Sequence, residues 1–158
     1  MPVAAIGIGA NLDDARSNVK QALDLLSEMG TVLRRSRIYH TPPWGVRDQP
    51  QFVNAAALLE TTLEPRALLR ALQDLERRLG RVPNYRWGPR IIDLDLLTYD
   101  DREIFDDELW LPHPRMLERA FVLVPLAEID EFYAPARDAL PPEEVAAVHP
   151  IDERVFPV

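Results

Sequence analysis

Two helical patterns of apolar residues, each closed by a glycine, divide the N-terminal part of the chain and limit the folds open to it. Between residues 15 and 29 the apolar side chains recur every three or four positions, and Gly30 follows. Between residues 65 and 79 a proline opens the run, leucines recur at the same spacing, and Gly80 follows. This spacing predicts two amphipathic helices, each of which needs another layer of structure to cover its apolar face.

Segments with the pattern of strands lie before, between and after these helices. Short apolar or alternating runs predict strands over residues 3–8, 31–39, 52–60 and 91–99. Asp100 and Asp101 predict a turn that makes the last of these strands one arm of a hairpin ending near Phe105. The order strand, helix, strand, strand, helix, strand is the split β-α-β pattern of ferredoxin-like folds. The sequence therefore predicts an α+β fold, with helices packed on an antiparallel sheet in α/β/α layers.

The composition fits one domain and excludes several kinds of site. The chain has 158 residues, 47% of them hydrophobic and 28% charged. We expect neither a membrane segment nor a signal peptide, because no apolar run reaches the roughly 18 residues of a membrane span and the first residues lack the pattern of a leader. Cysteine is absent, which excludes disulfides and thiolate metal sites and favours a cytoplasmic location. The net charge of −8 argues against a nucleic-acid partner, but a local basic cluster could still bind a nucleotide.

Residues 86–97 carry the clearest chemical pattern, Arg-Trp-Gly-Pro-Arg-Ile-Ile-Asp-Leu-Asp-Leu-Leu. Side chains alternate between the faces of a strand, so the apolar residues should point into the core while Asp93 and Asp95 share the opposite face. Two neighbouring carboxylates repel each other unless a cation lies between them, and Mg²⁺ binds one or two protein carboxylates together with water and phosphate oxygens. Two unrelated acids on a solvated strand are the simpler interpretation. Arg90, directly before the acids, favours a magnesium–nucleotide site instead.

The same segment resembles the signature R-W-G-P-R-x-x-D-L-D of the hydroxymethyldihydropterin pyrophosphokinases. Residues 6–12, 39–54 and 111–126 are similar to three further blocks of that family, in the same order and at fitting distances. The resemblance runs from about residue 3 to residue 130. It implies a single pyrophosphokinase domain over residues 1–158, in which residues 133–158 are the least certain part.

The resemblance also implies an activity. Such an enzyme transfers pyrophosphate from ATP to 6-hydroxymethyl-7,8-dihydropterin in folate biosynthesis and releases AMP. Asp93 and Asp95 would hold two magnesium ions, and ATP and the pterin would be the partners, with no nucleic acid and no membrane. Negative charge develops on the leaving α-phosphate, so metal ions and arginines are what the reaction needs. Asp95 could also orient or deprotonate the attacking hydroxyl group.

The family's functional residues carry over to matching positions of this chain. The catalytic residues would be Arg81, Arg90 and Asp95. The ATP-binding residues would be Glu76, Arg90, Leu96, His113 and Arg119. The pterin-binding residues would be Thr41, Pro42, Pro43, Trp44, Phe52, Asn54, Trp87 and Phe121. Within the last set, Phe52 and Asn54 stand two apart on a predicted strand, where an aromatic ring and an amide on one face suit a flat ring edged with donors and acceptors.

Simpler interpretations stay open for several of these residues. Phe52 and Phe121 could be ordinary core residues, His113 a structural histidine and Glu76 a surface acid. Glu108 and Trp110 stand where some family members have basic or hydroxyl contacts to the nucleotide, so no role is assigned to them. Two other classes of function also remain, a nucleotide-responsive regulatory module and a ferredoxin-like RNA-binding domain. The acidic charge and the strand carboxylates disfavour the RNA-binding domain.

Overall fold

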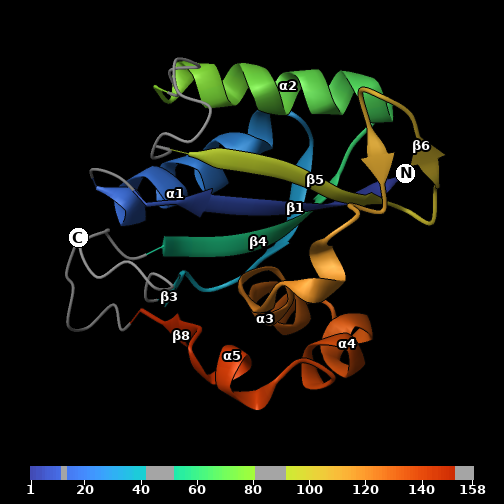
Figure 1. Ribbon diagram of the computed structural model, residues 1–158. Coiled ribbons are helices and arrows are strands. Elements are labelled where there is room, and N and C mark those ends of the chain that lie inside the picture. The colour runs from blue at the N-terminus through green and yellow to red at the C-terminus, as the bar shows by residue number, and fades with distance from the viewer. Residues whose placement is uncertain (12–13, 42–51, 81–91, 152–158) are drawn as a thin grey trace.

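The computed structural model describes residues 1–11, 14–41, 52–80 and 92–151. Its main sheet has the strand order β5-β1-β4-β3-β8, and β2 also pairs with β4 (Figure 1). The strands are β1 (Val3–Ala10), β2 (Thr31–Arg35), β3 (Tyr39–Thr41), β4 (Phe52–Glu60), β5 (Asp93–Tyr99) and β8 (His149–Pro150). All pairings among the described strands are antiparallel. The predicted α+β, ferredoxin-like arrangement is confirmed, with the strand after the first helix split into β2 and β3.

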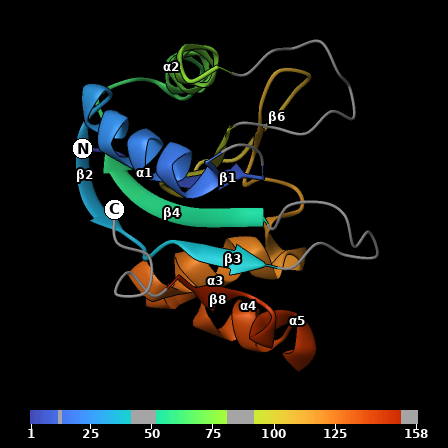
Figure 2. The ribbon, with the colours of Figure 1, turned by 90° about the vertical axis from the view of Figure 1, so that its left-hand side faces the viewer.

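Helices cover both faces of this sheet. The helices are α1 (Ala15–Leu25), α2 (Pro65–Arg78), α3 (Ala120–Ile129), α4 (Ala134–Asp138) and α5 (Pro142–Ala146), with short 3₁₀ turns η1 (Leu26–Glu28), η2 (Met116–Glu118) and η3 (Glu131–Tyr133). Figure 2 shows α1 and α2 on one side of the sheet and α3, α4 and α5 on the other. No helix in the described ranges is both long and apolar enough to span a membrane.

Two apolar cores hold these layers together, one on each face of the sheet. The core under α1 and α2 is the larger one, and Ile6, Leu23 and Leu72 are among its fully buried members. The core under α3 includes Leu97 and Leu126. Burial of leucine and isoleucine side chains contributes about 1.5–3 kcal/mol each, so both faces are firmly covered away from the ends of the strands.

The single strand predicted over residues 31–39 is interrupted by a bulge at Ser36. Ser36 donates its N–H to the Ala56 carbonyl (2.8 Å), and its hydroxyl accepts the Ala56 N–H (2.9 Å). Arg35 pairs with Ala57 and Tyr39 with Asn54, so four steps along one strand oppose three along the other. One extra residue reverses which side chains face which layer. The bulge therefore turns Tyr39, and Thr41 beyond it, to the α3 face of the sheet.

The prediction that β5 forms a hairpin with the segment ending near Phe105 was wrong, although the predicted turn at Asp100 exists. Asp100 adopts a positive φ of 49°, and its carboxylate accepts the Val3 N–H at 2.7 Å. This bond ties the turn to the start of β1, and beyond the turn the chain leaves the main sheet. The next strand, β6 (Ile104–Phe105), pairs with β7 (Trp110–Leu111) in a separate two-stranded sheet. The outer edge of β5 is thus left open for α2 and the site.

The segment from Tyr133 to Ile151 packs on the α3 face. Pro150 in β8 pairs with Tyr39 in β3, and the Ile151 N–H donates to the Ile38 carbonyl at 2.8 Å. Val148 is buried together with Tyr39 and Ala120. This contact anchors the start of α3 over β3.

Substitution of Ser36 tests the bulge. In Ser36→Ala the buried Ala56 N–H loses its acceptor, so we expect the free energy of unfolding to fall by about 1–3 kcal/mol. Chemical denaturation measures this loss. Ser27→Ala removes an exposed hydroxyl and should cost less than about 0.5 kcal/mol. Equal losses in the two variants would show that the Ser36 hydroxyl does not support the bulge.

Candidate functional site

The α3 face of the sheet carries polar side chains on both sides of β1. Asp93 and Asp95 project from β5, half-buried, while Ile92, Leu94 and Leu96 join the core under α1 and α2. The alternation expected from the sequence is therefore observed. Gly9 of β1 pairs with Asp93 on one side and with Asn54 of β4 on the other. Neighbouring strands lie about 4.8 Å apart, so the acids and the amide are about 10 Å apart on one surface.

Glycine at position 9 makes this surface open. A Cβ atom at Gly9 would lie 2.9 Å from the Asn54 amide nitrogen, closer than real Cβ contacts come. The amide therefore leans over the glycine backbone. At Gly9, between the acids and the amide, β1 presents only backbone atoms. A flat ligand or a phosphate chain can therefore lie close to the strand.

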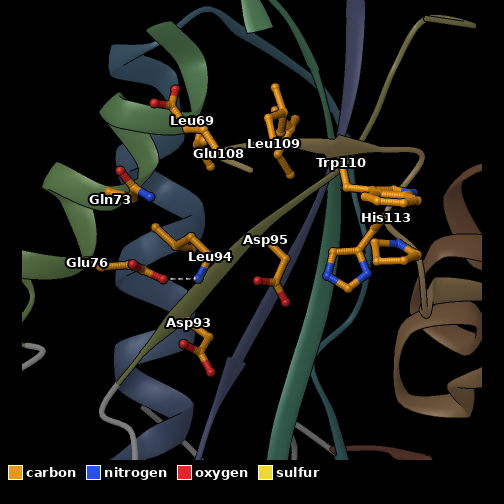
Figure 3. A pocket seen from close by; sticks show the side chains of 12 residues that line it. Leu69, Gln73, Glu76, Asp93, Leu94, Asp95, Glu108, Leu109, Trp110 and His113 are labelled. Carbon is orange, nitrogen blue, oxygen red and sulfur yellow. Dashed lines mark hydrogen bonds between the residues drawn. The ribbon is translucent and has the colours of Figure 1, made fainter. Parts of the chain in front are cut away.

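A cavity of about 310 Å³ lies along the outer edge of β5 (Figure 3). It brings together five residues predicted from the sequence, Glu76, Asp93, Asp95, Leu96 and His113. It also adds Gln73, Glu108 and Trp110, to which sequence reasoning assigned no role. Gln73 precedes Glu76 by one helical turn, so helix periodicity could have found it. The other two lie on the β6–β7 hairpin, whose position depends on long-range packing.

Glu76 closes the α2 side of this cavity and is not a surface acid. The residue is only 5% exposed, and its carboxylate accepts the N–H of Leu94 at 2.7 Å. Leu94 stands between Asp93 and Asp95 on an edge strand, where an N–H that points away from the sheet needs a partner. The interpretation of Glu76 as a surface acid is therefore wrong, and the bond fixes β5 where its two acids project.

His113 lies on the other side of Asp95. The backbone N–H of His113 donates to the Leu97 carbonyl at 2.8 Å, which ties this loop to β5. Burial lowers the pKa of His113; Asp95 opposes this shift and Arg119 adds to it. Burial therefore favours the neutral form of the imidazole. The Arg115 N–H donates to Nδ1 at 3.4 Å, which leaves the proton on Nε2 as a donor.

Polar side chains on β3 and β4, on the other side of β1 from the acids, mark a second candidate subsite. Thr41 pairs with Phe52 and Tyr39 with Asn54, so Thr41, Phe52 and Asn54 all face α3. The Thr41 hydroxyl and the Asn54 amide oxygen are buried, and neither has a hydrogen-bond partner. Since buried polar atoms nearly always have partners, two such atoms on one face of the sheet indicate a place for a ligand.

Two aromatic residues flank this subsite and are not core residues. Phe52 is 38% exposed and Phe121 is 37% exposed, so ordinary core packing does not describe them. Ala120 packs against Tyr39, which sets the start of α3 above the end of the sheet that carries Asn54. The Arg119 guanidinium lies 5.6 Å from the centre of the Phe121 ring. The charge of Arg119 also acts on His113, so this residue is near both aromatic and phosphate-side candidates.

The remaining predicted residues lie outside the described parts of the chain. They are Pro42, Pro43, Trp44, Arg81, Trp87 and Arg90. Among the described residues no group of three or more histidine or acidic side chains could hold a metal ion. A pair of carboxylates such as Asp93 and Asp95 fits Mg²⁺, because this ion completes its octahedron with water and substrate phosphates.

Comparison with known proteins identifies the family. Residues 5–131 match the family described as 7,8-dihydro-6-hydroxymethylpterin-pyrophosphokinase (HPPK). A protein of Methylorubrum extorquens named 2-amino-4-hydroxy-6-hydroxymethyldihydropteridine pyrophosphokinase is 46% identical over 131 residues, 82% of this chain and 83% of its own length. A protein of the same name from Bacillus subtilis is 46% identical over 129 residues, 80% of this chain and 77% of its own length. The chain belongs to this pyrophosphokinase family.

Solved structures agree on the fold. An HPPK-DHPS chain in complex with substrates superposes with a TM-score of 0.71 at 13% identity, over 87% of this chain and 43% of that one. Plasmodium falciparum HPPK-DHPS with pteroate gives a TM-score of 0.64 at 15% identity, over 80% of this chain and 38% of that one. This chain thus spans less than half of these longer chains, and at such identities the likeness concerns the fold alone.

Glu76 can be tested by two substitutions. Glu76→Ala removes the acceptor of the buried Leu94 N–H, so we expect the free energy of unfolding to fall by about 1–3 kcal/mol. Glu76→Gln keeps an amide oxygen at that place and should lose less. Thermal unfolding without ligands measures both, with Glu103→Ala as an exposed acidic control. If the glutamine variant lost as much as the alanine variant, the hydrogen bond to β5 would not be the stabilising contact.

Proposed function

We propose that this chain transfers the β,γ-pyrophosphate group of ATP to the hydroxymethyl group of 6-hydroxymethyl-7,8-dihydropterin, giving AMP and the pterin diphosphate for folate biosynthesis. Membership of the family and two relatives at 46% identity support this activity. The observation that carries it is the arrangement on one sheet face. Two carboxylates, Asp93 and Asp95, lie on one side of β1, and the buried Thr41 hydroxyl and Asn54 amide oxygen, which have no hydrogen-bond partner, lie on the other.

The carboxylate side would bind the triphosphate. Asp93 and Asp95 would hold two magnesium ions, which neutralise phosphate charge as the β-phosphorus is attacked. His113 would donate its Nε2 proton to a phosphate oxygen, and Arg119 would add positive charge beside it. Burial favours an uncharged His113 imidazole, which would not compete with a metal ion for the Asp95 carboxylate.

Further residues would complete the nucleotide site. We assign Arg81 and Arg90 to the phosphates as catalytic residues, and Glu76 and Leu96 to the wall that seats ATP. Asp95 also lies at the end of the acidic pair nearest His113 (Figure 3). That position suits the orientation of the attacking hydroxyl group.

The amide side would bind the pterin. Asn54 and Thr41 would pair their buried oxygens with donors at the edge of the ring, because leaving these oxygens unpaired costs free energy. Phe52 and Phe121 would stack on the two faces of the ring, which would cover their exposed parts. Pro42, Pro43, Trp44 and Trp87 would complete the enclosure, largely through backbone contacts.

Product analysis tests the reaction. The protein is incubated with MgATP and the pterin alcohol, and nucleotides and pterins are separated by chromatography. We expect AMP and the pterin diphosphate in equal amounts. ADP with a pterin monophosphate would indicate an ordinary kinase, and the absence of any nucleotide product would indicate a binding module. Both substrates are small soluble molecules, which suits a cytoplasmic enzyme with no nucleic-acid partner.

The aspartates are tested by charge removal. Asp93→Asn and Asp95→Asn should each lower the rate of AMP formation more than tenfold, a rise of at least about 1.4 kcal/mol in the barrier. The melting temperature without metal is measured for each variant to confirm that it is folded. Asp101→Asn removes an exposed acid outside the site and should leave the rate unchanged. A site variant that kept more than a tenth of the wild-type rate would contradict the metal assignment.

Asn54 is tested by separate ligand titrations. Asn54→Ala should weaken pterin binding about tenfold or more, because each buried polar group left unpaired costs about 1–3 kcal/mol. Its affinity for a MgATP analogue should stay within about twofold. Asn18→Ala, on α1 and away from the site, serves as the matched control. Equal losses for both ligands would mean that Asn54 acts through the fold.

A further inference from the structure

Glu128 of α3 binds the segment that leads from the Ser36 bulge into β3. Its carboxylate accepts the Arg37 backbone N–H at 3.0 Å and the Arg37 Nε–H at 3.1 Å. It also accepts a hydrogen bond from the Tyr39 hydroxyl group, and the Arg37 guanidinium donates to that hydroxyl oxygen at 3.3 Å. One acid near the C-terminal end of α3 therefore joins the helix to two nearby positions of the sheet.

These groups keep one arrangement near neutral pH. Tyr39 is 3% exposed, and the Glu128 side chain is 28% exposed. Burial and the hydrogen bond to Glu128 raise the pKa of Tyr39 to about 12, so its hydroxyl group keeps the proton and acts as the donor. Hydrogen bonds to an ionised acceptor are shorter and stronger than those between neutral groups. The contact between Tyr39 and Glu128 is therefore a firm link between strand and helix.

Tyr39 also packs against the first turns of α3. Its ring is buried together with Ala120 and Val148, and Val124 packs against this cluster. Ala120, Val124 and Glu128 follow one another at intervals of four residues, so they form one stripe along the helix. Contacts at three successive turns fix both the height and the rotation of α3 over β3.

This fixed rotation decides where Phe121 points. Phe121 stands seven residues before Glu128, almost two helical turns, so the two side chains project from α3 in nearly the same direction. On the sheet, Tyr39 pairs with Asn54. Tyr39 thus contacts both the strand that carries the amide and, through Glu128, the helix that carries the aromatic ring.

We propose that Tyr39 and Glu128 are positioning residues for the pterin, because their hydrogen bond holds Phe121 in place relative to Asn54 before the pterin binds. A ring that is already held in its bound position loses less conformational freedom when the ligand arrives, which favours binding. The proposal rests on the proposed function in placing the pterin at Phe121 and Asn54. It extends that function to two residues that act through Phe121 rather than by contact with the ligand.

Titrations with two ligands test this role. Dissociation constants are measured by calorimetry for α,β-methylene-ATP with magnesium, and for the pterin alcohol in the presence of saturating analogue. Tyr39→Phe keeps the buried ring but loses the bond to Glu128, so it should bind the pterin about tenfold more weakly, a change of about 1.4 kcal/mol. Its affinity for the analogue should stay within about twofold. Glu128→Ala should lose at least as much, whereas Glu128→Gln keeps an acceptor oxygen and should lose only about threefold.

Tyr99→Phe is the matched control for a purely structural effect. Tyr99 is 2% exposed, and its hydroxyl group donates to the Leu63 carbonyl at 2.6 Å within the core under α1 and α2. Both tyrosine variants lose one hydrogen bond of a buried ring, so both should lower Tm, but only Tyr39→Phe should weaken pterin binding. In steady-state kinetics Tyr39→Phe should raise the KM for the pterin, while kcat and the KM for ATP stay within about twofold, because bound pterin itself then holds Phe121 in place.

The outcomes separate the positioning role from the proposed function. Unchanged pterin binding in Tyr39→Phe, equal weakening of both ligands, or the same pterin loss in Tyr99→Phe would overturn the positioning role, and AMP formation by the wild-type protein would still support the proposed function. Pterin binding that depends on Tyr39 without AMP formation would support positioning and contradict the proposed function. If Tyr39→Phe did not fold, Glu128→Gln would decide, and unchanged pterin affinity in that variant would overturn the positioning role.

Discussion

The pairing of β1 with β5 on one side and β4 on the other is the constraint on which the site depends. Antiparallel pairing sets Asp93 and Asn54 on either side of Gly9, so all three face the same layer. A side chain at Gly9 would collide with the Asn54 amide. The sheet thus presents backbone atoms at Gly9, with carboxylates on the β5 side and an amide on the β4 side. Donor and acceptor substrates can meet there because rigid strands, rather than loops, hold the groups that would bind them.

The edge position of β5 explains the second half of the architecture. An edge strand leaves backbone N–H groups without sheet partners, and Glu76 accepts one of them from inside the protein. The same open edge leaves room for a cavity between α2 and the β6–β7 hairpin. The ion pairs of Arg66 with Asp106 and Glu108 hold the hairpin next to that cavity. Because the sheet ends at β5, Glu76 can bond the strand that carries Asp93 and Asp95, and a cavity can form beside these acids.

Much of this arrangement could be predicted from local sequence pattern. Alternation along residues 93–96 gave the facing of the acids, and helical spacing gave α1 and α2. The bulge at Ser36 could not be predicted, because it depends on a hydrogen bond to Ala56, twenty residues away in sequence. The separate hairpin was missed for the same reason, since Asp100 bonds to Val3, which is 97 residues away in sequence. Burial of Glu76 and the place of Trp110 likewise follow from packing between distant segments.

The central claim is that the two substrates lie on one sheet face, on opposite sides of β1. A crystal structure of the protein with magnesium, α,β-methylene-ATP and the pterin alcohol tests it most directly. We predict metal ions on Asp93 and Asp95, the pterin edge within hydrogen-bond distance of Asn54 and Thr41, and the hydroxymethyl oxygen directed at the β-phosphorus across Gly9. A pterin bound elsewhere, or a triphosphate that made no contact with the aspartates through a metal ion, would contradict the account.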